Sequence, residues 1–167
     1  NIEKETQNLL LQSNSFDTSW YNSGTALTSG QAGYDGTNDA WLASRGGAYN
    51  YVAQDISTSG VKSYSIYAKA GSFDWIYVRV QSTAGYQGTY FDLSSGSVGA
   101  SNSNIIDSAI ESVGNGFYRC TITFNLTLTR VLLYPVPNNN GIGSGTSGNI
   151  YIQDAQLNQG LIAQEVI

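Results

Sequence analysis

Several segments of this chain alternate apolar and polar residues with a period of two. This alternation constrains the fold more than any other feature of the sequence. In 75–82 the even positions are Ile76, Val78 and Val80, whereas the odd positions carry aromatic or polar side chains. A period of two is typical of a β-strand with one face on a hydrophobic core. The segments 64–70 and 117–126 alternate in the same way and are rich in Tyr, Val, Ile, Thr and Phe. We therefore predict half-buried strands.

Turn residues separate these segments, and no helical pattern lies between them. Asp35-Gly36, Ser59-Gly60 and Ser95-Gly96 are turn pairs, and 138–148 is a loop rich in Asn and Gly. Short strands without intervening helices predict an all-β fold, a single antiparallel β-sandwich of the jelly-roll type. The predicted strands are 9–11, 25–28, 40–44, 49–56, 62–70, 75–82, 88–93, 108–113, 116–125, 130–136 and 149–157.

Jelly-roll topology divides these strands between two sheets, because strands that follow one another along the chain alternate between the layers. One predicted sheet contains 49–56, 75–82, 88–93 and 130–136. The other contains 62–70, 116–125 and 149–157.

The length of 167 residues predicts one domain. We assign 8–160 to the sandwich, 1–7 to a linker remnant and 161–167 to a C-terminal tail. Because the chain has no Met and opens with Asn1, we expect a piece of a longer protein with neighbouring modules. It has no run of 18 apolar residues, so we expect no membrane insertion. The single cysteine, Cys120, continues an apolar alternation and is predicted to lie in the core.

Charge and composition exclude several functions. Seven Lys and Arg against twelve Asp and Glu give a net charge of −5, which disfavours nucleic acid as a partner. The chain has no His, the commonest general base and zinc ligand. A glycosidase needs two carboxyl groups across a cleft, and the four glutamates, Glu3, Glu5, Glu111 and Glu165, lie mostly near the ends. We therefore expect no enzyme.

The outward face of 75–82 is unusually aromatic. If its aliphatic residues point inward, the odd positions leave aromatic rings, a guanidinium and an amide on one exposed stripe. Flat rings suit the C–H faces of sugars, and planar polar groups suit their hydroxyls. We predict a ligand-binding stripe for a poly- or oligosaccharide on one sheet, formed by Trp75, Tyr77, Arg79, Gln81, Tyr51, Tyr90 and Tyr134.

Several motifs, in this order, resemble a known domain type. They are Asn8–Phe16 followed by Trp20, Asp35-Gly36 with Ala40, Tyr51–Gln54, Tyr64–Gly71, Tyr90–Gly96, Gly114–Arg119 and Asn149–Leu157. Together they resemble the carbohydrate-binding-module-like jelly-roll domains of phage tail and other virion proteins, which are distantly similar to modules appended to bacterial glycanases. The resemblance implies a non-catalytic module that presents an aromatic groove to a polysaccharide, outside cells or on a virion.

The resemblance also implies a structural calcium ion between the first and last strands. It nominates Asp154 and oxygens near Asn14 as ligands, although Asp154 could instead accept hydrogen bonds from buried backbone N–H groups. Trp41 departs from the family pattern, as does the C-terminus at 163–167. The sequence leaves open whether Trp41 is an extra stacking platform or a core residue.

Two other functions remain as alternatives. The domain could be a structural or receptor-binding module of a phage tail or virion protein that binds no sugar. It could also be a jelly-roll polysaccharide lyase, in which exposed Arg, Gln and Tyr side chains act on a uronate. Lyases of that type usually use a His, which this chain lacks.

Overall fold

A computed structural model describes residues 8–10 and 14–160 of the chain. These residues form an all-β fold with one short 3-10 helix, η1 (Gly141–Gly143). The strands are β1 (Tyr21–Ser23), β2 (Thr25–Gln31), β3 (Ala40–Arg45), β4 (Tyr51–Ala70), β5 (Trp75–Ser82), β6 (Gly85–Asp92), β7 (Ser97–Ser101), β8 (Ile105–Gly114), β9 (Phe117–Val136) and β10 (Gly148–Gln159). All their pairings are antiparallel.

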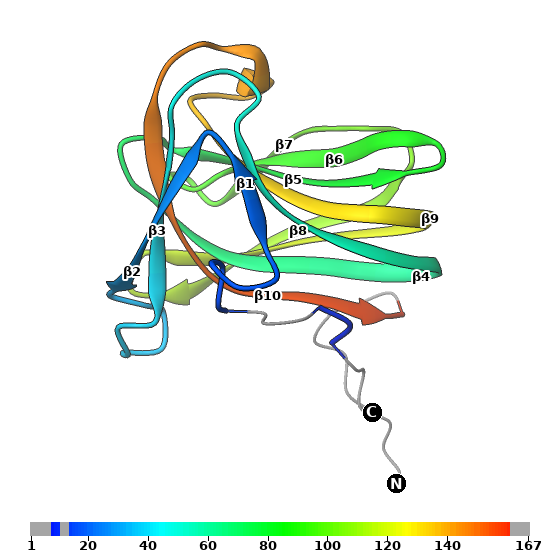
Figure 1. Cartoon of the computed structure of the whole chain (residues 1–167), viewed down its shortest axis with the longest axis horizontal. Helices are drawn as coiled ribbons and strands as arrows, with labels where there is room; N and C mark the ends of the chain where they lie inside the picture. Colours follow the sequence, from blue (N-terminus) through cyan, green and yellow to red (C-terminus); the bar gives the residue numbers. More distant parts are fainter. Residues whose placement is uncertain (1–7, 11–13, 161–167) are drawn as a thin grey trace, which may run out of the picture.

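Two long strands connect the layers of the sandwich. β4 and β9 have 20 residues each and pair with one another along most of their length. Their halves 51–55 and 130–136 pair with β1 and β5, and the sheet continues through β6 and β7. Their halves 58–70 and 117–128 lie next to β10 and β8, and β10 continues through β3 to β2. Figure 1 shows β4 and β9 running side by side through the molecule.

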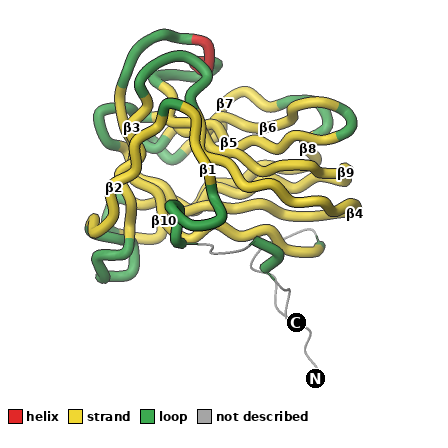
Figure 2. Tube along the Cα trace, viewed as in Figure 1, coloured by secondary structure: helices red, strands yellow, loops and turns green. Residues whose placement is uncertain are grey.

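The main core lies between these two parts of the sheet. Ile76 and Val78 of β5 belong to the same buried cluster as Ile66 of β4, Ile122 of β9 and Ile152 of β10. Each of these side chains occupies the apolar position of its strand's alternation, and all are fully buried. The tube in Figure 2 shows how much of the described chain is strand, with loops gathered at the strand ends.

The predicted grouping of the segments is found, but the prediction of two separate sheets is wrong, because β4 and β9 run through both groups and join all the strands in one ten-stranded sheet. Segments 49–56, 75–82, 88–93 and 130–136 pair in one part of the sheet through β4, β5, β6 and β9. Segments 62–70, 116–125 and 149–157 pair in the other. The inward positions of β5 are confirmed, and Cys120 lies in the core, where burial raises the pKa of its thiol.

Some strand boundaries are corrected. Segments 49–56 and 62–70 form one strand, and so do 116–125 and 130–136. Ser59-Gly60 is not a turn, because Gly60 takes its positive φ of 104° inside β4, just after a register shift between Asp55 and Thr58. β1 and β7 were not predicted, because β1 is a three-residue, fully exposed Tyr-Asn-Ser segment and β7 contains Gly99 and Ala100, which are depleted in strands.

The predicted first strand, 9–11, lies partly outside the described residues, and Leu9 and Leu10 have no strand conformation. Leu9 nevertheless donates a backbone hydrogen bond to Leu157 at 2.8 Å. The predicted linker 1–7 and tail 161–167 also lie outside the described residues. Within the described ranges, no helix is long and apolar enough to cross a membrane.

Candidate functional site

The outer surface of the sheet formed by β4, β9, β5 and β6 carries the candidate site. The pairing register of the strands determines which side chains share this surface, because directly opposed residues of antiparallel strands project to the same side. One row crosses all four strands, and we call it the polar row: Tyr86, Gln81, Arg130 and Asp55. At an interstrand spacing of about 4.8 Å, the row is about 14 Å long.

Next to the polar row, three tyrosines form a second, smaller core on this outer face. The rings of Tyr77 and Tyr90 are stacked with centroids 3.9 Å apart, and Tyr134 packs against Tyr77 at 5.6 Å. Ala53, Leu132 and Val136 complete this tyrosine cluster. The partly buried residues that pack on it are Tyr51, Trp75, Ala100 and Ile142.

The predicted stripe therefore exists, but its centre is not open to solvent. Trp75, Tyr77, Arg79 and Gln81 do share the outer face, as the alternation required. The prediction that Tyr77, Tyr90 and Tyr134 are exposed is wrong, since their exposed fractions are 5%, 5% and 3%. These three tyrosines form a packed cluster, and Ile142 of η1 packs against it.

A buried arginine holds the segment around η1 in place. Arg45 ends β3 with 2% of its surface exposed, and its guanidinium lies 5.5 Å from the ring centroid of Phe73. It donates hydrogen bonds to the backbone carbonyls of Thr146 (3.1 Å), Ile142 (3.4 Å), Gly141 (3.5 Å) and Ser144. This arginine was not among the predicted site residues.

Arg79 lies between the tyrosine cluster and the polar row. Its Nη1 donates to the hydroxyl of Tyr134 at 3.0 Å, and its guanidinium carbon lies 4.0 Å from the ring centroid of Tyr86. Its Nε is buried without a hydrogen-bond partner. Tyr86 is 40% exposed, so its ring covers the cation and presents an aromatic surface to solvent.

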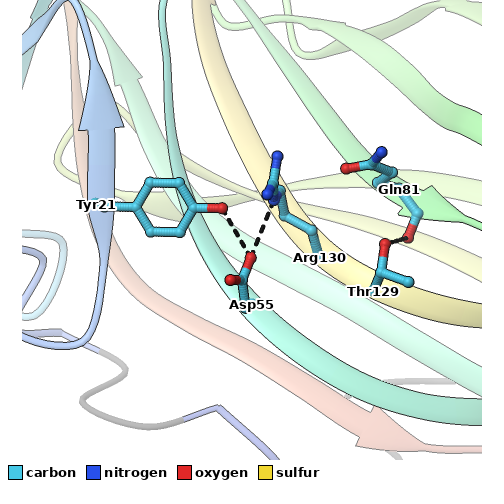
Figure 3. A network of polar contacts seen from close by, with 5 residues as sticks. All are labelled: Tyr21, Asp55, Gln81, Thr129 and Arg130. Carbon is cyan, nitrogen blue, oxygen red and sulfur yellow. Dashed lines mark hydrogen bonds and ion pairs between the residues drawn. The ribbon is translucent and has the colours of Figure 1, made fainter.

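At the other end of the polar row, Asp55 holds two partners through one oxygen. The Tyr21 hydroxyl donates to Asp55 Oδ1 at 2.7 Å, and Arg130 Nε donates to the same atom at 3.0 Å. The Arg130 guanidinium also lies 5.4 Å from the Tyr21 ring centroid. Figure 3 shows Tyr21 and Asp55 on one side of Arg130, with Gln81 and Thr129 on the other.

An open hollow of about 460 Å³ lies beside the polar row. Its lining residues are Asp55, Ile56, Ser57, Gln81, Thr129 and Arg130. The hollow has a structural cause: the β4–β9 register shifts between Asp55 and Thr58, so Ile56, Ser57 and Thr129 are left out of the ladder. Such bulges bend a strand locally and redirect its side chains.

The hydrogen bond between Tyr21 and Asp55 predicts an unusual titration. Burial, together with donation to the Asp55 carboxylate, raises the pKa of Tyr21 to about 12 from the usual value near 10. Both effects favour the neutral phenol, so the bond persists as pH rises through 10 and is lost near 12. We expect the ring-carbon resonance of Tyr21, followed by NMR, to titrate near pH 12 and at lower pH in Asp55→Asn.

A wild-type Tyr21 that ionises near pH 10 would contradict this geometry. Tyr49→Phe is the matched control, because Tyr49 is 60% exposed and lies outside this network. It should leave the Tyr21 titration unchanged.

The predicted ligand residues thus separate by exposure. Gln81 lines the hollow, whereas Tyr51, Trp75 and Arg79 are half-buried and do not line it. Tyr51 and Trp75 pack on the tyrosine cluster instead. Trp41 is a core residue, 9% exposed, whose indole N–H donates to the Asn14 carbonyl at 2.8 Å.

The prediction missed Tyr86, Asp55, Arg130 and Tyr21 on this surface. Asp55 and Arg130 follow from the alternation of their strands, but only the pairing of β4 with β9 shows that they meet. Tyr21 lies on a strand of three residues, too short to show any alternation.

The predicted calcium ligands do come together, but as hydrogen-bond partners. Asn14 Oδ1 accepts the backbone N–H of Asp154 at 2.9 Å, and the Tyr34 hydroxyl donates to Asp154 Oδ2 at 3.0 Å. Burial raises the pKa of Asp154, and the negative charges of Asp35 and Asp39 raise it further. In the described part of the chain, no three His, Cys, Asp or Glu residues form a group able to hold a metal ion. These residues do not form a calcium cage as they stand, so calcium stays a prediction.

No protein-family model matches the chain, and no curated protein does. Several solved structures are similar to the chain, including the following two. One is the enzymatically active domain of bacteriophage CBA120 tailspike protein 4, with 14% identity and a TM-score of 0.48 over 93% of this chain and 21% of that chain. The other is the K2 cleaved adhesin domain of Lys-gingipain, with 13% identity and a TM-score of 0.47 over 95% of this chain and 98% of that chain.

This chain therefore spans about a fifth of the tailspike chain that it matches. Neither likeness is close enough to assign a function. The class that fold and site define is an all-β, antiparallel sandwich with an aromatic and polar outer surface.

Proposed function

We propose that this chain is a non-catalytic carbohydrate-binding module that takes a poly- or oligosaccharide on the outer surface along the polar row. The observation that carries the proposal is the chemistry around the hollow. An exposed tyrosine ring lies at each end, Tyr86 and Tyr21, and a guanidinium, a carboxylate and an amide lie between them. Rings stack on the apolar faces of sugars, and the polar groups bind hydroxyls.

The accessible area is small, so the affinity is expected to be modest. Two exposed rings and a few hydrogen bonds, each about 1 kcal/mol after losses, correspond to dissociation constants between about 10 µM and 1 mM. A module of this strength acts best in several copies, as on a virion or an extracellular multimodular protein. We therefore place the protein outside cells or on a virion.

A glycan array followed by calorimetry tests the proposal. The glycan that wild type binds best is titrated into Tyr86→Ala, which we expect to weaken binding at least fivefold because a stacking surface is lost. The matched control is Tyr49→Ala, which removes an exposed tyrosine away from the polar row and should bind like wild type. Absence of any bound glycan, or equal affinities for all three proteins, would contradict the proposed site.

The burial of the tyrosine cluster favours a second candidate, a structural or receptor-binding module of a virion protein. In that case the outer aromatic residues stabilise the sheet or contact a neighbouring module. Analytical ultracentrifugation over a concentration series separates the two functions. A structural module should self-associate and ignore glycans, whereas a binding module should stay in one state and bind them.

A further inference from the structure

We infer that the hollow at the Asp55 end of the polar row selects an uncharged sugar, with Asp55 and Arg130 acting as a paired acceptor and donor for neighbouring hydroxyls. The inference rests on the proposed function and narrows it to a class of ligand. Two observations support an uncharged ligand: which charged side chains line the hollow, and which of their polar atoms already make hydrogen bonds within the protein.

The two charged residues of the hollow neutralise one another. Arg130 and Asp55 form an ion pair at 3.0 Å, and the remaining lining residues, Ile56, Ser57, Gln81 and Thr129, carry no charge. The other guanidinium of this face, Arg79, is covered by Tyr86 and donates to Tyr134, and it does not line the hollow. A uronate or sulfate entering the hollow would therefore meet no unpaired cation there, and it would approach the Asp55 carboxylate.

The whole chain adds to this discrimination, because its formal net charge is −5. An anionic polymer is repelled by such a field at low ionic strength, whereas a neutral glycan is not affected. Charge therefore disfavours acidic polysaccharides both locally and globally.

The free atoms of the pair suit hydroxyl groups. Tyr21 and Arg130 both donate to Oδ1 of Asp55, which leaves Oδ2 as an acceptor on a side chain that is 68% exposed. Arg130 engages Asp55 through Nε, so its terminal nitrogens remain as donors. A fixed acceptor beside a fixed donor matches two adjacent hydroxyls of a sugar ring, each of which can accept and donate.

Tyr21 has the role of a positioning residue in this arrangement. Its hydroxyl fixes Asp55 Oδ1, and its ring lies beneath the Arg130 guanidinium at 5.4 Å. The two donated hydrogen bonds also lower the pKa of Asp55, which keeps its carboxylate an acceptor well into the acid range. Replacing the hydroxyl should loosen the pair without removing either member.

The experiment uses matched pairs of polysaccharides that differ only in charge. Alginate, polygalacturonate and hyaluronan are compared with their carboxyl-reduced forms, alongside neutral glucan, galactan and mannan, by affinity electrophoresis and then calorimetry. We expect the full chain to bind at least one neutral or carboxyl-reduced polymer at least tenfold more tightly than any acidic one. Asp55→Asn should weaken that binding at least tenfold, and Tyr21→Phe about threefold to tenfold.

Asp107→Asn is the control for the charge change, because Asp107 is exposed on β8, in the other part of the sheet. It should bind like wild type, and near-UV circular dichroism verifies that each variant is folded. Gln81→Ala is a second variant of the hollow that changes no charge, and it too should weaken binding.

Each other outcome has a distinct meaning. Tighter binding of the acidic polymers would overturn the inference while leaving carbohydrate binding intact. Neutral binding that neither Asp55→Asn nor Gln81→Ala weakens would also overturn it, because the sugar would then lie elsewhere. If no polymer of the panel and no glycan of the array binds, the proposed function and the inference fail together.

Discussion

Arg45→Met is expected to lower the free energy of unfolding by about 2–4 kcal/mol, because four carbonyls of one loop lose their shared donor. A surface arginine would not have this effect. Arg45 is almost completely buried, and Met fills part of its volume without offering a hydrogen bond. Unfolding in urea, followed by tryptophan fluorescence, measures the loss.

The same substitution should loosen the segment around η1, whose Ile142 packs on the tyrosine cluster and which we call its cover. With the carbonyls of Gly141, Ile142 and Ser144 released, we expect the amides of 137–147 to exchange their hydrogens faster under native conditions. Mass spectrometry of peptides from this segment measures the exchange rate.

Two controls accompany the variant. Arg45→Lys keeps the positive charge but loses the planar guanidinium and its several donors. Its stability should fall between that of wild type and that of Arg45→Met. Arg130→Met removes an arginine whose ion pair with Asp55 is solvent-exposed, and it should cost less than about 1 kcal/mol. An Arg45→Met protein as stable as wild type, with unchanged exchange in 137–147, would show that this arginine does not hold the segment.

Local alternation was enough to predict which face of each strand meets the core. Ile76, Val78 and Val80, the apolar positions of 75–82, are buried in the main core as their pattern indicated. The alternation of apolar and polar residues indicates which face of a strand is buried, and it can be seen within a few neighbouring residues. It therefore survives in a single sequence.

What covers the other face is not a local property. Ile142, which packs on the cluster that holds Tyr77 and Tyr90, lies about 50 to 65 residues further along the chain, in a segment rich in Gly and Asn. No periodic pattern in that segment indicates that it packs on a sheet. The burial of Arg45, however, could have been predicted from the sequence. Positions 41, 43 and 45 of β3 alternate with 42 and 44, so Arg45 points to the same side as the buried Trp41 and Ala43.

The hollow was beyond sequence reasoning for a related reason. It depends on the register in which β4 meets β9, and a shift of one residue would separate Asp55 from Arg130. The predicted turn at Ser59-Gly60 concealed that pairing, because it divided β4 into two strands near the position of the shift. In a sequence, a long strand with an internal bulge therefore looks like two shorter strands, as β4 and β9 did.

Tyr77→Ala is expected to lower the free energy of unfolding by about 3–5 kcal/mol while leaving glycan affinity within twofold of wild type. The ring is 5% exposed, stacks on Tyr90 at 3.9 Å and donates from its hydroxyl to Asn102 at 3.3 Å, so its removal leaves a cavity beneath the cover. Urea unfolding measures the stability. Calorimetry at a temperature where the variant is folded, with the glycan that wild type binds best, measures the affinity.

Tyr77→Phe keeps the ring and loses only the hydroxyl, and it should cost about 1 kcal/mol. The pair of variants separates packing from recognition, because a buried ring stabilises the fold whether or not a sugar is present. If Tyr77→Ala were as stable as wild type and lost glycan binding, the ring would be a ligand contact, and the cover over the tyrosine cluster would have to open before a sugar binds. The expected combination, a large stability loss with unchanged affinity, instead assigns recognition to the exposed polar row and stabilisation to the tyrosines beside it.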